Sequence, residues 1–431
     1  MATSTTTSTT TSATTPVTTS GEDPGSSLSW RRYLQLVLVL GSLTALGPLT
    51  IDMYLPALPN LTADLATTES AAQATITGML VGLGVGQLVI GPLSDAVGRR
   101  RPLIAGVVGH LFASVLCALA PSIALLTGAR LLQGLSAAAV AVVSMAIVRD
   151  LFAGSAAATL LSRLMLVTGI APVLAPSIGG LVLGVTSWRG VFVVLAVAAF
   201  LLLWVAVLGL RETLPEQRRR TARPAAILAT YRGLLRDRTF VALVLISGLA
   251  FATLFSYISG SSFVLQNVYG LSSGAYAVVF GVNSAGLVLA TQINPLLVAR
   301  FGPRRVLRGA IAVGLVASAV LLAGAVVGAG GLAMLLVPLW FVIGSVGCIM
   351  PNTPALALTR HGESAGTAAA MLGAAQFVIG GLAAPLVGAF GDGSAVPMGA
   401  VMAGAMLLAG ILVVTGVRAG ATDPEPVPLP A

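Results

Sequence analysis

Long apolar segments alternate with short polar ones along most of the chain. A helix needs about 20 mainly apolar residues to cross a lipid bilayer. Segments that meet this requirement lie near residues 33–58, 72–94, 102–120, 122–148, 160–184, 189–210, 240–264, 275–298, 306–327, 332–356, 365–390 and 396–417. The pattern therefore predicts an all-α membrane protein with twelve transmembrane helices.

Polar segments divide the chain further. The one long polar segment between apolar ones, residues 211–239, is rich in arginine and separates a six-helix half at 30–210 from a second at 240–418. We interpret it as a cytoplasmic linker. Residues 1–29 are rich in Thr and Ser and lack the apolar middle of a signal peptide, so we expect a disordered cytoplasmic tail. Residues 419–431 form a second short tail.

Composition supports a lipid-covered surface. Hydrophobic residues make up 56% of the chain and charged residues only 9%, whereas a soluble protein carries about 25% charge. The net charge of +9 comes from arginine alone, since the chain has no lysine. These arginines lie between apolar segments and form no patch of their own, so we expect no nucleic-acid partner. Cys117 and Cys348 lie inside apolar runs and indicate neither a disulfide nor a metal site.

The arginines also orient the helices. With the N-terminus inside the cell, one side of the membrane carries Arg31, Arg32, Arg99, Arg100, Arg101, Arg149, Arg163, the linker arginines, Arg300, Arg304, Arg305, Arg308, Arg360 and Arg418. Only Arg189 then falls outside, and only Arg130 falls within the membrane. Because positive residues favour the cytoplasmic side, we expect a multi-pass protein of a bacterial cytoplasmic membrane with both termini inside.

The two halves carry a related loop. Gly98 in the loop at 91–101 aligns with Gly302 in the loop at 295–305, which lies 204 residues later. Two six-helix halves repeated in parallel are typical of transporters that rock around a central site.

The first loop carries a family signature. It matches the pattern G-x-L-x-D-x-x-G-R-R at Gly91, Leu93, Asp95, Gly98, Arg99 and Arg100, and so resembles the major facilitator superfamily. The resemblance implies the major facilitator fold, with two pseudo-symmetric halves. It also implies that the loop charges, together with Asp150, form a gate that latches the cytoplasmic side shut. The alternative is that these charges only mark the membrane interface. The second loop has Ala299 where the first has Asp95, which implies a weaker latch there.

Further motifs are similar to the bicyclomycin and chloramphenicol resistance (Bcr/CflA) type within that superfamily. They are the segment Leu46–Pro59, the arginine motif from Arg130 to Gly134, Trp188 with Arg189, and Phe280 with Asn283. The antiporter motif of such exporters is matched at Pro172, Pro176, Gly179 and Gly180, although Ala171 and Ala175 stand where the pattern prefers glycine.

Two charges fall within the predicted membrane helices, Asp52 and Arg130. A charge in the bilayer is costly unless it is paired or hydrated, which makes each a functional hypothesis. Both lie at a similar depth from the outer surface, so we expect them to share one water-filled cavity and to couple transport to protons. The alternatives are that Asp52 bonds locally before Pro56 and that Arg130 ties down the carbonyls of a helix break.

Aromatic and amide side chains in the helices suit a cavity for partly polar ligands. The candidates for the substrate cavity are Tyr54, Gln133, Phe255, Tyr257, Gln266, Asn283 and Gln376. Each of them has the alternative of simple packing. His110 is either a packed polar residue or a group that titrates near neutral pH.

The sequence therefore predicts a proton-coupled exporter of small drug-like molecules, of the kind exemplified by chloramphenicol or bicyclomycin, that works by alternating access. The alternative is a proton-coupled importer or facilitator of a small metabolite. The chain has no Walker sequence, metal-ligand cluster or nucleophile triad, so we expect no enzyme activity, no metal and no cofactor beyond the coupling proton. The expected partners are a small-molecule drug and the lipid bilayer, and two halves suffice for a monomer.

Overall fold

The computed structural model describes residues 30–152, 154–219, 224–328, 330–361, 364–389 and 393–417. The tails predicted at 1–29 and 419–431 lie outside the described residues, as do Asp392 and Arg418.

The helices of the first half are α1 (Trp30–Asp52), η1 (Leu55–Ala57), α2 (Leu58–Asp64), α3 (Glu69–Val97), α4 (Arg100–Ala118), α5 (Ile123–Leu151), α6 (Gly154–Leu183) and α7 (Trp188–Gly209). The linker holds η2 (Glu216–Arg218) and α8 (Pro224–Arg236). The second half comprises α9 (Arg238–Phe263), η3 (Val264–Val268), α10 (Ser273–Phe301), α11 (Pro303–Val327), α12 (Gly331–Thr359), α13 (Ala365–Ala389) and α14 (Val396–Thr415).

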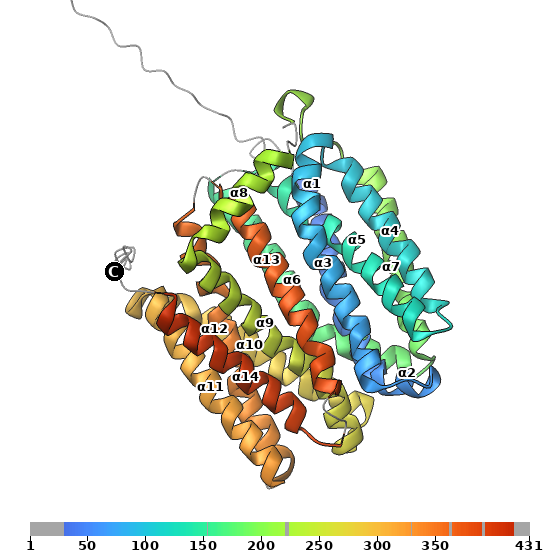
Figure 1. Cartoon of the computed structure of the whole chain (residues 1–431). Coiled ribbons are helices and arrows are strands. Elements are labelled where there is room, and N and C mark those ends of the chain that lie inside the picture. Colours follow the sequence, from blue (N-terminus) through green and yellow to red (C-terminus); the bar gives the residue numbers. More distant parts are fainter. Residues whose placement is uncertain are drawn as a thin grey trace, which may run out of the picture.

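The long helices run side by side as one bundle (Figure 1). Within the described residues, 11 helical segments are long and apolar enough to cross a membrane. The remaining long helix is α6, with 30 residues, of which only some side chains are described. The prediction of an all-α protein with twelve spans is therefore confirmed.

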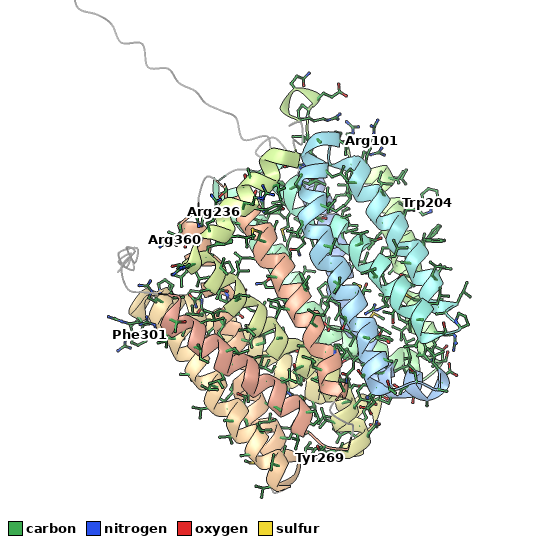
Figure 2. The ribbon with its side chains drawn as sticks, viewed as in Figure 1. Arg101, Trp204, Arg236, Tyr269, Phe301 and Arg360 are labelled. Carbon is green, nitrogen blue, oxygen red and sulfur yellow. The ribbon has the colours of Figure 1, made fainter. Side chains whose placement is uncertain are left out.

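The surface is apolar around the bundle and charged at one end. Exposed side chains such as Leu181, Val185 and Leu208 are hydrophobic, as a lipid-facing surface requires. Arg101, Arg236 and Arg360 gather at one end of the helices, while Tyr269 lies at the other (Figure 2). We call the first end the arginine-rich side.

The first predicted span, 33–58, lies within one apolar crossing at Leu34–Asp64, but this crossing contains a helix break that was not predicted. Helix α1 ends at Asp52, and the chain continues through the short 3₁₀ turn η1 before α2 begins at Leu58. Pro56 and Pro59 explain this break, because a proline has no N–H to donate and its ring displaces the preceding turn. The break places Asp52 at a helix end in the bundle interior, where it is buried.

The linker contains more structure than the sequence predicted. Residues 211–239 include the helix α8, and Leu234 is buried against the second half. Tyr231 of the same helix contacts the first half, since its hydroxyl donates to the carbonyl of Leu88 on α3 at 3.5 Å. The linker therefore contacts both halves at the arginine-rich side.

Helices α3 and α5 approach each other closely at glycine. A Cβ atom added to Gly134 of α5 would collide with the backbone carbonyl of Met79 on α3. Small residues at such crossings let membrane helices gain van der Waals contact, which is a main source of their association energy. This contact holds α5, and therefore Arg130, against the core of the first half.

We predict that Gly134→Ala destabilises the protein by about 1–3 kcal/mol, because the added methyl overpacks a closed helix crossing. The matched control is Gly128→Ala on the same helix, where an added Cβ meets open space. Thermal unfolding of the two variants in detergent micelles measures the difference. Equal melting temperatures for both variants would contradict the packing account.

Candidate functional site

Asp52 is the last residue of α1 and is only 4% exposed. Its Oδ1 atom has no hydrogen-bond partner among the described residues. The carboxyl group interacts electrostatically with the hydroxyl groups of Tyr257 on α9 and Tyr276 on α10. A first-half carboxyl group thus lies within electrostatic range of two tyrosines of the second half, without a hydrogen bond to either among the described residues.

The second half also contributes buried polar side chains, and some of their atoms lack a hydrogen bond. The Tyr257 ring stacks on Phe280 with centroids 5.2 Å apart. Its hydroxyl lies near the Asn283 side chain, yet the Tyr257 oxygen and Asn283 Oδ1 both lack a hydrogen bond of normal geometry. Buried polar atoms are almost always bonded, so each of these unpartnered atoms can take a hydrogen bond from a proton-bearing group, a water or a polar ligand group.

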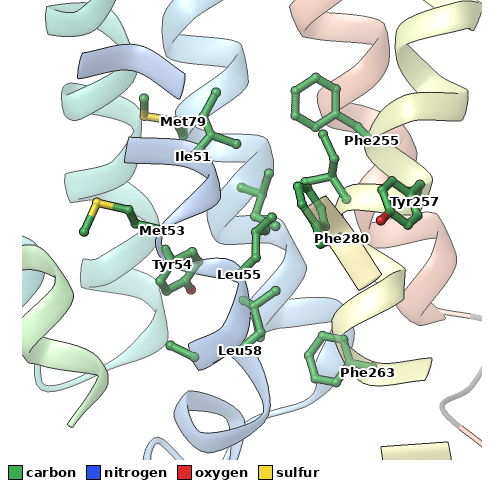
Figure 3. Close-up of a cluster of buried hydrophobic side chains, with 14 of the residues drawn as sticks. Ile51, Met53, Tyr54, Leu55, Leu58, Met79, Phe255, Tyr257, Phe263 and Phe280 are labelled. Atoms are coloured by element: carbon green, nitrogen blue, oxygen red, sulfur yellow. The ribbon is translucent and has the colours of Figure 1, made fainter. Parts of the chain in front are cut away.

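Apolar side chains of both halves surround these polar groups. Figure 3 shows Ile51, Leu55 and Leu58 of the first half facing Phe280 and Phe263 of the second half, within one buried cluster. The cluster excludes much of the water that would otherwise weaken charge interactions at Asp52.

Arg130 is fully buried inside the first half. One terminal nitrogen donates to the carbonyl of Thr50 at 3.0 Å and to Gln133 Oε1 at 2.8 Å. The guanidinium group also lies over the rings of Tyr54 and Phe192, at 5.0 and 5.8 Å from their centroids. Its Nε and second terminal nitrogen have no hydrogen-bond partner among the described residues.

A hydrogen-bonded network continues from Arg130 into α4. Gln133 Nε2 donates to Ser114 Oγ at 2.8 Å, and Ser114 donates to the carbonyl of His110 at 2.7 Å. His110 Nε2 lies 3.3 Å from the Thr50 hydroxyl. His110 is therefore packed into the network that holds Arg130, although its Nδ1 atom has no partner in the described part of the chain.

The cavity expected to hold both Asp52 and Arg130 stays a prediction. Among the described residues, neither an ion pair nor a hydrogen bond joins them. Thr50 and Tyr54 both contact Arg130. Asp52 lies midway between them in the sequence, and residues two positions apart on a helix point to opposite faces.

The antiporter motif lies against this helix end. A Cβ atom on Gly179 of α6 would collide with the carbonyl of Met53, the residue after Asp52. Pro176 is buried, and Gly180 faces the carbonyl of Ser273 at the start of α10. The side chain of Pro172 lies outside the described residues. The motif thus lets α6 pack directly on the break that positions Asp52.

The other predicted cavity residues lie in separate places. Tyr54 and Gln133 are bonded within the first half, and Phe255 packs in the second half against Phe251. Gln266 donates to Ser262 Oγ at 2.8 Å, and Gln376 donates to Ser247 Oγ at 2.7 Å. Of the predicted set, Tyr257 lies within electrostatic range of Asp52, and the Asn283 side chain lies near Tyr257. The role of the set as a cavity lining stays a prediction.

The predicted gate residues do form a cluster. The buried Arg99 side chain bonds Asp95 at 2.6 Å and Asp150 at 2.9 Å. Gly98 has φ +96°, a conformation that favours glycine, and an added Cβ would also crowd the Glu212 carboxylate. Arg100 donates to the carbonyls at the end of α7, while Gly91 accepts from Ser94.

This cluster stays within the first half and the start of the linker. Six hydrogen bonds between described residues of the two halves lie toward the side opposite the arginines. These bonds are Ser262 to the carbonyl of Leu55, Gln266 to that of Pro56, Asn267 to Glu69, Ser70 to the carbonyl of Pro385, Thr77 to that of Gly381, and the Gly388 amide to Gln73. The halves are therefore tied together at that side, and the role of the loop charges as a latch on the other side stays a prediction.

The sequence prediction missed Glu212. Its carboxylate accepts from the backbone amides of Arg99, Arg100, Thr213 and Leu214 at 2.8–3.2 Å. Burial raises the pKa of Glu212, but these four amides outweigh it and hold that pKa below its usual value. The signal in the sequence was an acid directly after the sixth span, on the same side as the signature loop.

Asp237 was missed as well. Its Oδ1 caps α9 by accepting from the Thr239 amide at 2.9 Å, and its Oδ2 bonds Arg360 and His361 at 3.2 and 3.0 Å. Burial raises the pKa of the Asp237 carboxyl, but the capped amides and the two basic side chains together hold it below its usual value. An aspartate just before an apolar span is a common helix cap.

Comparisons with known proteins agree on the family. A model of the Major Facilitator Superfamily matches residues 40–385. The MFS-type transporter YdgK of Bacillus subtilis is 39% identical over 375 residues, which cover 86% of this chain and 92% of YdgK. The bicyclomycin resistance protein homolog of Haemophilus influenzae is 30% identical over 84% of this chain and 91% of its own. The D-xylose–proton symporter structure superposes with a TM-score of 0.71 at 16% identity, covering 90% of this chain and 98% of that one, so it shows the shared fold alone.

We predict that Glu212→Gln lowers thermal stability at pH 7 and that the difference from the unmodified protein disappears at low pH. A folded-state pKa below the unfolded value stabilises the protein above the unfolded pKa of about 4.3, and this contribution is lost as pH falls through the folded value. Melting temperatures of both proteins across pH 7 to pH 3 measure it.

The control is Glu216→Gln, since Glu216 is exposed and bonds Arg219 at 3.4 Å. A Glu212→Gln deficit of constant size across this pH range, or one equal to that of Glu216→Gln, would contradict the assignment.

Proposed function

Because the chain belongs to the major facilitator superfamily, a family of membrane transporters, we propose that it exports small drug-like molecules in exchange for protons. The observation that carries the proposal is Asp52, a buried carboxyl group without a hydrogen-bond partner on Oδ1, at the contact between the two halves. A group that must change its protonation state during transport needs this combination of burial and incomplete bonding.

Proton and cargo would compete for the same carboxyl group. An ionised Asp52 in the apolar contact is unfavourable, and either a proton or a polar group of the cargo relieves it. The hydroxyl of Tyr257 and the amide of Asn283 give the cargo a second polar contact from the opposite half. Cargo that binds from the cytoplasm would release the proton there, and a proton that binds from outside would release the cargo.

Alternating access would follow from the two sides of the bundle. We assign the arginine-rich side to the cytoplasm of a bacterial cell, with both termini inside, as arginine placement favours. The hydrogen bonds at the opposite side would break when the protein opens outward. The rigid cluster of Asp95, Arg99 and Asp150 would then meet the second half and close the cytoplasmic side.

Relatives support a drug-like cargo. The bicyclomycin resistance protein homolog and the multidrug resistance protein MdtL of Escherichia coli, 31% identical over 61% of this chain, are named for resistance to such compounds. We propose cargo of the same class, including bicyclomycin and chloramphenicol. The protein would act as a monomer, without a metal or any cofactor other than the proton.

We predict that Asp52→Asn abolishes cargo-dependent proton movement and leaves the fold intact. Asparagine has the shape of a protonated aspartic acid, and no hydrogen bond to Oδ1 is lost. Energised inside-out vesicles with an internal pH dye receive chloramphenicol, bicyclomycin or tetraphenylphosphonium in turn. The unmodified protein should release protons on addition of cargo, and Asp52→Asn should match vesicles without the protein.

Two further variants sharpen this test. Asp64→Asn changes an acid that bonds Arg189 and Trp188 away from the proposed site, and it should retain proton movement. His110→Gln changes the rival titratable group. Proton release that survives Asp52→Asn and vanishes in His110→Gln would contradict the role of Asp52. Proton and cargo movement in the same direction would instead indicate an importer.

A further inference from the structure

A groove opens on the membrane-facing surface of the second half, where α10, α11 and α12 meet. It has a volume of about 520 Å³. Its walls include Leu289, Val313 and Phe341, each about half exposed to the surroundings. It runs from the middle of α10 and α12 to the arginine-rich ends of α10 and α11. None of the predicted transport residues lines this α10–α12 groove.

Glycine creates the hollow. Gly309 of α11 and Gly344 of α12 both line it, and an added Cβ at either would meet no atom within 4 Å. Helices in a membrane normally pack against each other at glycine, as Gly134 does against α3. At the groove the same residue type leaves an unfilled apolar space that faces the lipid.

The arginine-rich end of the groove is strongly basic. Arg305 lines this end and is exposed, and the Arg300 guanidinium lies 5.3 Å from the ring centroid of Phe301, another lining residue. The sequence holds no acid between Asp237 and Glu363, so no carboxylate flanks these helices in the chain. Among the described residues, neither Arg300 nor Arg305 forms an ion pair.

The first half differs at the related loop. Arg101 is the counterpart of Arg305, 204 residues earlier, but the neighbouring Arg99 is neutralised by Asp95 and Asp150. In the second half Ala299 replaces Asp95. Since Arg300 and Arg305 form no ion pair within the described part of the chain, they remain able to bind an anion from outside.

We propose that the α10–α12 groove binds an anionic phospholipid from the leaflet on the arginine-rich side. The acyl chain lies along the apolar walls, and the phosphate lies at Arg305. Basic pockets between membrane helices on the cytoplasmic side suit anionic headgroups by charge, and the apolar walls that extend from Arg305 to the middle of α12 suit a chain. The bound lipid fills the space that Gly309 and Gly344 leave. This site is independent of the proton and cargo chemistry at Asp52.

Native mass spectrometry of the full chain in detergent, titrated with dioleoyl-phosphatidylglycerol or dioleoyl-phosphatidylcholine, tests the site. The chains of the two lipids are identical, so their difference reports the headgroup. We expect tighter binding of phosphatidylglycerol, and Arg305→Gln should weaken it about fivefold, as one arginine near a lipid surface contributes. Binding of phosphatidylcholine should stay unchanged in this variant. Gly344→Leu, which fills the groove, should weaken both lipids.

Two matched variants serve as controls. Arg101→Gln removes the counterpart arginine of the first half, and Gly404→Leu adds the same side chain at an exposed glycine of α14 with open space beside it. Both should bind the two lipids as the unmodified protein does, and equal melting temperatures establish that all variants are folded.

Equal phosphatidylglycerol binding by Arg305→Gln and Arg101→Gln would overturn the headgroup site. Binding that is insensitive to Gly344→Leu would overturn the groove. Equal affinity for both lipids, with displacement by tetraphenylphosphonium, would assign the groove to lipophilic cargo instead.

Discussion

An unpaired charge is expensive inside a lipid bilayer, and this constraint separates the two ionisable groups at the centre of the bundle. Arg130 is held within the first half by Gln133, the carbonyl of Thr50 and two aromatic rings, and its Nε and second terminal nitrogen have no hydrogen-bond partner among the described residues. Asp52 has no hydrogen-bond partner on Oδ1 among the described residues and lies within electrostatic range of Tyr257 in the second half. Arg130 therefore interacts within the first half, whereas Asp52 lies where the two halves meet.

The backbone around Asp52 explains how this contact is built. Pro56 and Pro59 end the regular helix, and Gly179 lets α6 pack on the carbonyl that follows Asp52. Nearby, the hydrogen bonds from Ser262 and Gln266 to the carbonyls of Leu55 and Pro56 satisfy the backbone that the break leaves open. Because these donors belong to the second half, the break in α1 can be satisfied in this way only while the halves are closed at that side.

Much of the fold follows from the sequence, because the length of apolar runs and the placement of arginine depend on the bilayer itself. Twelve spans in two halves were predicted on that basis. The α1 break was missed because the apolar pattern continues through Pro56, and α8 was missed because arginines obscure its apolar face. The cluster around Arg99 was foreseen from its motif, whereas Glu212 required knowledge of which loops meet. Asp52 and Arg130 were placed at equal depth, but their separation depends on helix rotation, which hydropathy does not encode.

The central claim is that cargo and proton compete for Asp52. The most direct measurement is proton release by the purified protein in weakly buffered detergent solution when tetraphenylphosphonium, chloramphenicol or bicyclomycin binds. The account predicts release of protons on binding by the unmodified protein, and cargo binding without proton release by Asp52→Asn. Proton release of undiminished size from Asp52→Asn would contradict it.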